Sequence, residues 1–303
     1  MTTENGSVLL FFIDGLGIGT RGSANPLDGL DNVAPFALFQ GEPLRTIHDG
    51  TVVATDACLG VAGRPQSASG QTTILTGVNA PALLGYHKQG FPNGPLLEIL
   101  RQHSVFLKLN GAGVTPITFA NAYTKRFFEE RPRWVSATTA AVEAAGLSFR
   151  TIDDLRSDLA LYQDFTNAIL IDRGENVPMR TAAEAAAVLA GIVGKHRFTL
   201  YEYFITDKIG HSQDMRAAKA VLQNLSRLIT DLLDQLDLDQ TSVVLTSDHG
   251  NIEDLSTRNH TLNAVPTIVW GAKRKTIAAQ IGNLADITPV VIETLSQSAK
   301  AHQ

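Results

Sequence analysis

The sequence predicts an α/β fold in which helices sandwich a mainly parallel central sheet, and two observations lead to this prediction. Short runs rich in β-branched and aromatic residues alternate along the chain with longer segments of helical periodicity. Several of the short runs are apolar at consecutive positions, which is typical of central strands covered on both faces. Alternation of this kind favours a layered α/β architecture over an all-β or all-α one.

Six short runs bounded by turn-forming residues predict strands. The first, VLLFFI at residues 8–13, is apolar throughout and stops at Asp14, so it is too short for a signal peptide or a membrane span. The others are shorter or less uniformly apolar, and their composition is again that of strands. They lie at residues 52–55, 168–171, 200–205, 243–246 and 267–270.

Three segments have the periodicity of helices. Residues 215–236 form the clearest one, because apolar residues recur three or four positions apart and Asp214 precedes them as an N-cap. Residues 181–193 are rich in alanine, which has the highest helix propensity. A last helix is predicted at 289–295, where Pro289 suits a first turn.

Composition and charge exclude several classes of protein. The 303 residues are 44% hydrophobic and 18% charged, enough to bury a sizeable core. The formal charge of −5 gives no basic surface for nucleic acid, so we expect neither a nucleic-acid nor a membrane partner. A single cysteine, Cys58, cannot form an internal disulfide, which favours a reducing cytoplasm. The oligomeric state stays open.

The middle of the chain differs from both ends. Its periodicity is weaker, and turn clusters occur at residues 90–95 and 111–113. We therefore predict a discontinuous core made of residues 1–87 and 180–303, with an inserted cap domain at 88–179 that binds the substrate. Hinges at the two junctions would let this cap close over the site.

Metal-type ligands follow the predicted strands. In open α/β sheets functional residues collect at the carboxyl ends of strands. Three carboxylates and three imidazoles with no thiolate suit Zn²⁺ or Mn²⁺, with Mg²⁺ a further possibility, and six ligands exceed one tetrahedral site. Two such ions can stabilise the entering and the leaving oxygen in a displacement at phosphorus. The six residues are Asp14, Asp207, His211, Asp248, His249 and His260.

A nucleophile is predicted in the segment RPQSASGQTTILTG at residues 64–77, where helix-start signals are dense. A hydroxyl at a helix N-terminus lies beside free N–H groups, which stabilise an attached phosphate. Coordination to a metal ion would lower the pKa of that hydroxyl and activate it.

Together these residues resemble the alkaline phosphatase superfamily, and most of all its branch containing cofactor-independent phosphoglycerate mutase and phosphopentomutase. In those two mutases the nucleophile is followed three residues later by glycine, and in the wider superfamily by a Thr-Gly pair nine and ten residues later. Ser67 meets both spacings, with Gly70, Thr76 and Gly77, whereas Ser69 meets neither.

The resemblance implies an alkaline-phosphatase-like core with two metal sites and a phosphoserine intermediate on Ser67. The first site would comprise Asp14, Ser67, Asp248 and His249, and the second Asp207, His211 and His260. The chain departs from the branch at Gln71, where both mutases have histidine, and in its shorter middle segment.

Hydrolysis of a small phosphorylated metabolite, by a phosphatase or phosphodiesterase, is therefore the favoured expectation. An intramolecular phosphomutase is the alternative, and a non-catalytic metal or phosphate-binding protein is less favoured. Cationic and amide side chains around the site and on the cap are the expected substrate contacts. These are Arg64, Gln71, Lys125 and Arg126.

Overall fold

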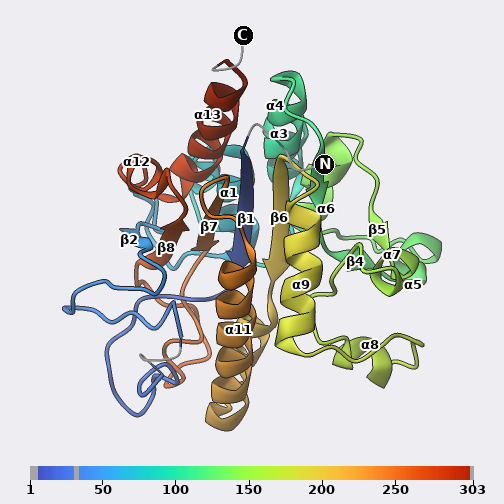
Figure 1. Cartoon of the computed structure of the whole chain (residues 1–303). Helices are drawn as coiled ribbons and strands as arrows, with labels where there is room; N and C mark the ends of the chain where they lie inside the picture. Colours follow the sequence, from blue (N-terminus) through green and yellow to red (C-terminus); the bar gives the residue numbers. More distant parts are fainter. Residues whose placement is uncertain (1–5, 31–33, 301–303) are drawn as a thin grey trace.

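The centre of the molecule is a six-stranded sheet with helices on both faces (Figure 1). The computed structural model describes residues 6–30 and 34–300. Strand order is β2-β8-β7-β1-β6-β3; β1 runs parallel to β6 and β7, β3 is parallel to β6, and β8 is antiparallel to β7 and β2. The predicted α/β fold is thus confirmed. The strands are β1 (Ser7–Ile13), β2 (Thr51–Thr55), β3 (Ile117–Phe119), β6 (Phe198–Tyr203), β7 (Thr241–Ser247) and β8 (Val265–Trp270).

The central strands are apolar at consecutive positions because both of their faces are covered. Along β1, Leu9, Phe11 and Ile13 belong to one buried cluster, which the helices α9 (Ala182–Val193) and α11 (Met215–Gln235) cover. Alternate side chains of the same strand belong to a second buried cluster on the opposite face. The helices of that face are α1 (Ser67–Thr76), α3 (Gly94–His103), α4 (Val105–Gly111), α6 (Ala137–Ala144), α12 (Arg274–Ala278) and α13 (Ile287–Lys300).

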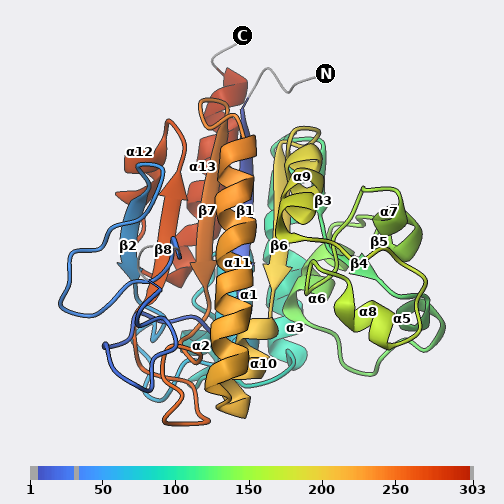
Figure 2. The same cartoon turned by 60° about the horizontal axis from the view of Figure 1, so that its bottom comes forward.

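The helix pair in front of the sheet begins where the sequence predicts. Figure 2 shows α9 and α11 side by side. Asp214 caps α11 by accepting the N–H of Ala217 at 2.9 Å, and Thr181 with Glu184 forms a capping box at the start of α9. Within residues 6–30 and 34–300, no helix combines the length and apolar character needed to cross a bilayer.

One predicted strand is wrong. Residues 168–171 lie in the short helix α8 (Ala168–Asp172), not in a strand. The Asp164 carboxylate accepts the N–H of Ile169 at 3.0 Å, and Asn167 has a positive φ of 68° that turns the chain into this helix. A four-residue apolar run is too short for its periodicity to separate strand from helix.

Two further boundaries differ. The strand expected at 200–205 is β6 and ends at Tyr203, because the helix α10 (Ile205–Ser212) begins immediately afterwards. The last helix begins at Ile287, two residues before Pro289, after the 3-10 turn Leu284–Asp286. Proline is tolerated there because the N–H groups of the first turn have no partner within the helix.

The predicted insertion at 88–179 differs from the structure in part. Its strand β3 extends the main sheet, and α3, α4 and α6 pack on the same face as α1. The small helix α2 (Ala80–Leu84) precedes them. A separately packed part stands to the right in Figures 1 and 2. It comprises β4 (Ala122–Tyr123), α5 (Lys125–Glu129), β5 (Arg150–Thr151), α7 (Ile152–Arg156) and α8.

The N-cap of α11 gives a first test of this fold. Replacement Asp214→Ala removes the acceptor for the Ala217 N–H, so the free energy of unfolding should fall by about 1 kcal/mol in urea denaturation. Asp239→Ala is the matched control, because it removes an exposed carboxylate of the same charge outside any cap. Equal losses for both variants would contradict the capping role.

Candidate metal centre

The six predicted ligands meet at the carboxyl ends of three adjacent strands. Asp14 directly follows β1, and Asp248 and His249 directly follow β7. Asp207 and His211 lie one turn apart on α10, the helix that follows β6, while His260 comes from the loop before β8. Parallel strands end at the same edge of a sheet, so residues far apart in sequence converge there.

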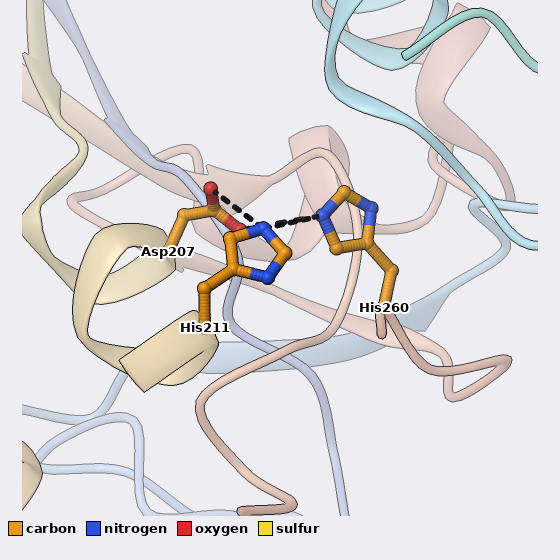
Figure 3. Close-up of side chains that lie close together, drawn as sticks. All are labelled: Asp207, His211 and His260. Carbon is orange, nitrogen blue, oxygen red and sulfur yellow. Dashed lines mark hydrogen bonds and ion pairs between the residues drawn. The ribbon is translucent and has the colours of Figure 1, made fainter. Parts of the chain in front are cut away.

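One cluster consists of Asp207, His211 and His260 (Figure 3). The Nε2 atoms of His211 and His260 each lie 3.4 Å from an Asp207 carboxylate oxygen. These two nitrogens are 3.3 Å apart. Their three donor atoms therefore surround a common point, as the ligands of one ion would.

Backbone carbonyls set the tautomers of both histidines in this cluster. Nδ1 of His260 lies 3.0 Å from the carbonyl oxygen of Pro65, and Nδ1 of His211 lies 2.6 Å from that of Arg258. Because a carbonyl oxygen only accepts, each Nδ1 donates, and in the neutral rings the two Nε2 lone pairs face one another. Such a pair cannot form a hydrogen bond, whereas a shared cation satisfies both lone pairs. The residues present thus fit a divalent metal ion.

A second cluster surrounds His249. Its Nε2 atom lies 3.3 Å from Asp14 Oδ1, 3.4 Å from Asp248 Oδ2 and 2.9 Å from the Ser67 hydroxyl. Ser67 is the first residue of α1, so its hydroxyl stands at the positive end of that helix. This cluster has the ligand types of a second cation site beside a hydroxyl group.

The two clusters are contiguous. Asp207 also lies with Asp14 and His249 in a group whose ligand atoms are all within 4.8 Å of one another. The rings of His249 and His260 stack with their centroids 3.6 Å apart. Gly15 allows the close approach of α10, since a Cβ there would lie 2.9 Å from the Asp207 Cβ and its φ is +75°. Two ions bound here would be close neighbours.

Burial and charge crowding shift the pKa values of these groups. Burial raises the pKa of Asp14, and burial together with the charge of Asp207 raises the pKa of Asp248 to about 7. The net pKa of Asp207 is lowered to about 2. Burial alone would raise it, but the hydrogen bond with His260 and the nearby imidazoles together outweigh that effect. Burial lowers the pKa of His249 to about 3, so its ring is neutral, the form that binds metal.

Glu253 is a functional residue that the sequence analysis missed. One carboxylate oxygen accepts the N–H groups of Gly17 at 2.9 Å and Asn251 at 2.7 Å. The other accepts the Thr261 hydroxyl at 2.5 Å and the Asn263 amide at 3.0 Å. Glu253 thus joins the loop after β1 to the loop that carries His260. The only feature of the sequence that could have pointed to Glu253 is its position shortly after Asp248, in the same loop.

Gln71 lies inside the site, where it contacts ligands. Its side-chain amide donates to Asp14 Oδ2 at 3.0 Å and to Asp248 Oδ2 at 3.3 Å. These hydrogen bonds orient both carboxylates toward His249. Asn251 has the same role for Asp207, to which its amide donates at 2.7 Å. Gln71 therefore borders the predicted substrate site and also positions the ligand carboxylates.

The predicted cationic substrate contacts lie elsewhere. Lys125 and Arg126 are 82% exposed and form ion pairs with Glu129 and Glu130, one turn along α5. These i,i+4 pairs run along the helix surface, and neither Lys125 nor Arg126 lines the cavity beside Ser67. Arg64 is exposed and lines a different, shallow hollow.

Comparison with known sequences agrees with a metal centre. Residues 174–299 match the family model described as Metalloenzyme superfamily. The chain is 29% identical over 109 residues to the 2,3-bisphosphoglycerate-independent phosphoglycerate mutase of Ehrlichia canis, covering 34% of this chain and 22% of that protein. For the mutase of Francisella tularensis the identity is 28% over 127 residues, covering 39% and 25%. The alignments thus span a quarter of these relatives or less.

Solved structures share the fold over nearly the whole chain. The cold-active alkaline phosphatase of Shewanella sp. has a TM-score of 0.53 and 11% identity, covering 95% of this chain and 99% of its own. The alkaline phosphatase of the Antarctic bacterium TAB5 has a TM-score of 0.50 and 12% identity, covering 95% and 98%. At such identities the likeness concerns the arrangement of the chain.

The role of Glu253 can be tested without any substrate. Glu253→Ala leaves buried donors of Gly17, Asn251 and Thr261 without an acceptor, so the free energy of unfolding of the metal-free protein should fall by about 3 kcal/mol. Urea denaturation measures this loss, and calorimetric titration with Mn²⁺ should show weakened binding. Glu253→Gln is the control, because it keeps one acceptor oxygen and should lose less. An alanine variant as stable as wild type would contradict the cross-link.

Proposed function

We propose that this chain, which belongs to the alkaline phosphatase superfamily and is a metal-dependent enzyme, hydrolyses small phosphate esters through a phosphoserine intermediate on Ser67. One observation carries the proposal: the Ser67 hydroxyl lies 2.9 Å from His249 Nε2, inside the converging set of carboxylates and imidazoles. The N-cap of α1 is Gln66, and the hydroxyl of Ser67, one residue later, interacts with His249.

Two groups of residues would hold the ions. Asp14, Ser67, Asp248 and His249 would bind one, and Asp207, His211 and His260 the other, with Asp207 next to both. Zn²⁺ and Mn²⁺ suit this donor set best, and Mg²⁺ suits its carboxylates. When bound, such ions lower the pKa of a coordinated hydroxyl and balance the charge of a transferring phosphoryl group.

Ser67 carries the covalent chemistry. Its Oγ attacks phosphorus, the Oγ–P bond forms, and the bond from phosphorus to the leaving oxygen breaks in line. The N-terminus of α1 faces the charge that develops on the phosphoryl oxygens. The proton of the Ser67 hydroxyl ends on the leaving oxygen, which departs as the alcohol. A water oxygen then attacks phosphorus, the Oγ–P bond breaks, and one proton of that water returns to Ser67 Oγ as phosphate leaves. A diester would react in the same way and release a monoester.

Hydrolysis is favoured over a mutase outcome by the contents of the site. Gln71 uses its amide to hold Asp14 and Asp248, and an amide cannot transfer protons as the histidine of the two mutases can. Among the described residues, those that line the adjoining cavity include no lysine, arginine or histidine that could hold a second anionic group of a substrate such as phosphoglycerate.

The expected cytoplasmic location stays a prediction.

Ser67→Ala tests the covalent step. The variant should keep its metal content yet lose turnover of p-nitrophenyl phosphate by roughly a thousandfold or more, since no nucleophile remains. Mass spectrometry of acid-quenched wild type should find phosphate on Ser67. Ser69→Ala is the matched control, because that hydroxyl bonds to backbone groups of Gln66 and Lys88 and should keep most turnover.

Two outcomes would overturn the proposal. Full activity of Ser67→Ala would move the nucleophile elsewhere. Conversion of sugar phosphates to isomers without release of inorganic phosphate would make the enzyme a mutase.

Metal stoichiometry tests the assignment of ligands. His211→Ala should bind one equivalent of metal where wild type binds two, measured by elemental analysis after gel filtration in Mn²⁺ or Zn²⁺, because one site loses an imidazole. His103→Ala, at the end of α3 away from the site, should retain both equivalents. Unchanged stoichiometry in His211→Ala would show that the assignment is wrong.

A further inference from the structure

A cavity of about 510 Å³ opens beside Ser67, and aromatic rings form a large part of its wall. Asp14, Ser67 and Gln71 form the end that adjoins the metal centre. A phosphate ester reacting at Ser67 would therefore place its alcohol portion in this space. Six of the aromatic lining residues are Phe91, Phe119, Tyr123, Phe127, Trp134 and Tyr162.

Glu202 brings a carboxylate to this aromatic wall. It is 7% exposed, lies on β6 beside Phe12 of β1, and lines the cavity. The Asn121 side chain fixes its backbone, donating to the Glu202 carbonyl at 2.8 Å and accepting the Glu202 N–H at 3.0 Å. The position of the carboxylate is thus set by the sheet and its edge.

Glu202 has no cationic partner in the described part of the chain. Among the described residues no ion pair involves it, and the lining of the cavity contains no lysine, arginine or histidine. Burial raises its pKa to about 7, against the opposing effect of the Thr138 hydroxyl. A buried carboxylate without a cationic partner carries a free-energy cost that a positively charged ligand would remove.

The aromatic rings favour the same kind of ligand. Tyr123 and Phe127 have ring centroids 4.6 Å apart, and the Tyr123 hydroxyl is held by Thr139 at 2.8 Å, which fixes the orientation of the ring. Faces of aromatic rings are electronegative and attract organic cations. An anionic alcohol portion would be repelled by Glu202, and a neutral apolar one would leave it uncompensated.

We propose that the alcohol portion of the substrate is an organic ammonium group, held between Glu202 and the aromatic wall while its phosphate reaches Ser67. This inference rests on the proposed phosphoryl transfer and deepens it. The reaction would take one water and one phosphate ester of a methylated amino alcohol, and release the amino alcohol and inorganic phosphate. A methylated ammonium fits best, because ring faces contact methyl groups and need no N–H donor.

A pair of isosteric esters tests whether the positive charge on the alcohol portion of the substrate is recognised. Phosphocholine and 3,3-dimethylbutyl phosphate differ by nitrogen against carbon at the same position, so the ratio of their kcat/KM values reports the charge alone. Metal-loaded wild type should prefer phosphocholine by about tenfold or more. Glu202→Gln should reduce that ratio by about tenfold, whereas Glu143→Gln, an exposed carboxylate on α6, should leave the ratio at the wild-type value. A ratio near one in wild type, or one independent of Glu202, overturns the inference.

Binding of choline chloride separates this inference from the proposed function. Calorimetric titration requires no turnover, and wild type should bind choline at least about tenfold more tightly than Glu202→Gln. Phe127→Leu, which keeps an apolar side chain but loses the ring face, should also weaken binding and serves if the Glu202 variant does not fold. Glu202-dependent choline binding with no ester hydrolysed would refute the proposed function alone. Hydrolysis of both esters at equal rates, with no choline binding, would refute the ammonium site alone.

Discussion

Mutual repulsion among three crowded carboxylates, two of them buried and the third half-buried, is the constraint around which this molecule is organised. Asp14, Asp207 and Asp248 converge where parallel strands end, and burial with the neighbouring charge raises the pKa values of Asp14 and Asp248. Imidazoles and amides surround them in place of lysine or arginine. Such an arrangement is unfavourable as a set of bare charges and becomes favourable when divalent cations bind between them. The neighbouring hydrogen bonds orient the carboxylates and imidazoles for that binding.

Much of this centre could be predicted from the sequence, because Asp14, Asp248 and His249 come directly after strands and Asp207 lies soon after another. The ends of parallel strands share one edge, so the order of motifs along the chain was enough to bring Asp14, Asp207 and Asp248 together. Other features depend on contacts that no local pattern contains. The three residues of β3 gain their strand conformation from pairing with β6, and the short run at 168–171 becomes helical through Asp164. Side-chain direction was equally inaccessible, as the outward ion pairs of Lys125 and Arg126 show.

The metal centre and the aromatic cavity share one rigid foundation. Asp14 follows β1 and Glu202 lies on β6, and these two strands pair in parallel along their whole length. The separation between the phosphate end and the alcohol end is therefore set by strand register, whereas the aromatic walls come largely from short elements such as β4 and α5 and from the loops around them. Sites built on paired strands hold their geometry more closely than sites built on loops, so changes in the walls can alter the accepted alcohol while the chemical centre stays intact.

The cross-link made by Glu253 has a consequence for the newly synthesised chain. Glu253 bonds to Gly17 across 236 residues of sequence, and the His260 loop lies beyond it. During translation Asp14 and Ser67 leave the ribosome long before Asp248 and His260 exist, so the early chain presents only fragments of each ligand set. Each set of ligand residues is therefore complete only once the last strands have joined the sheet.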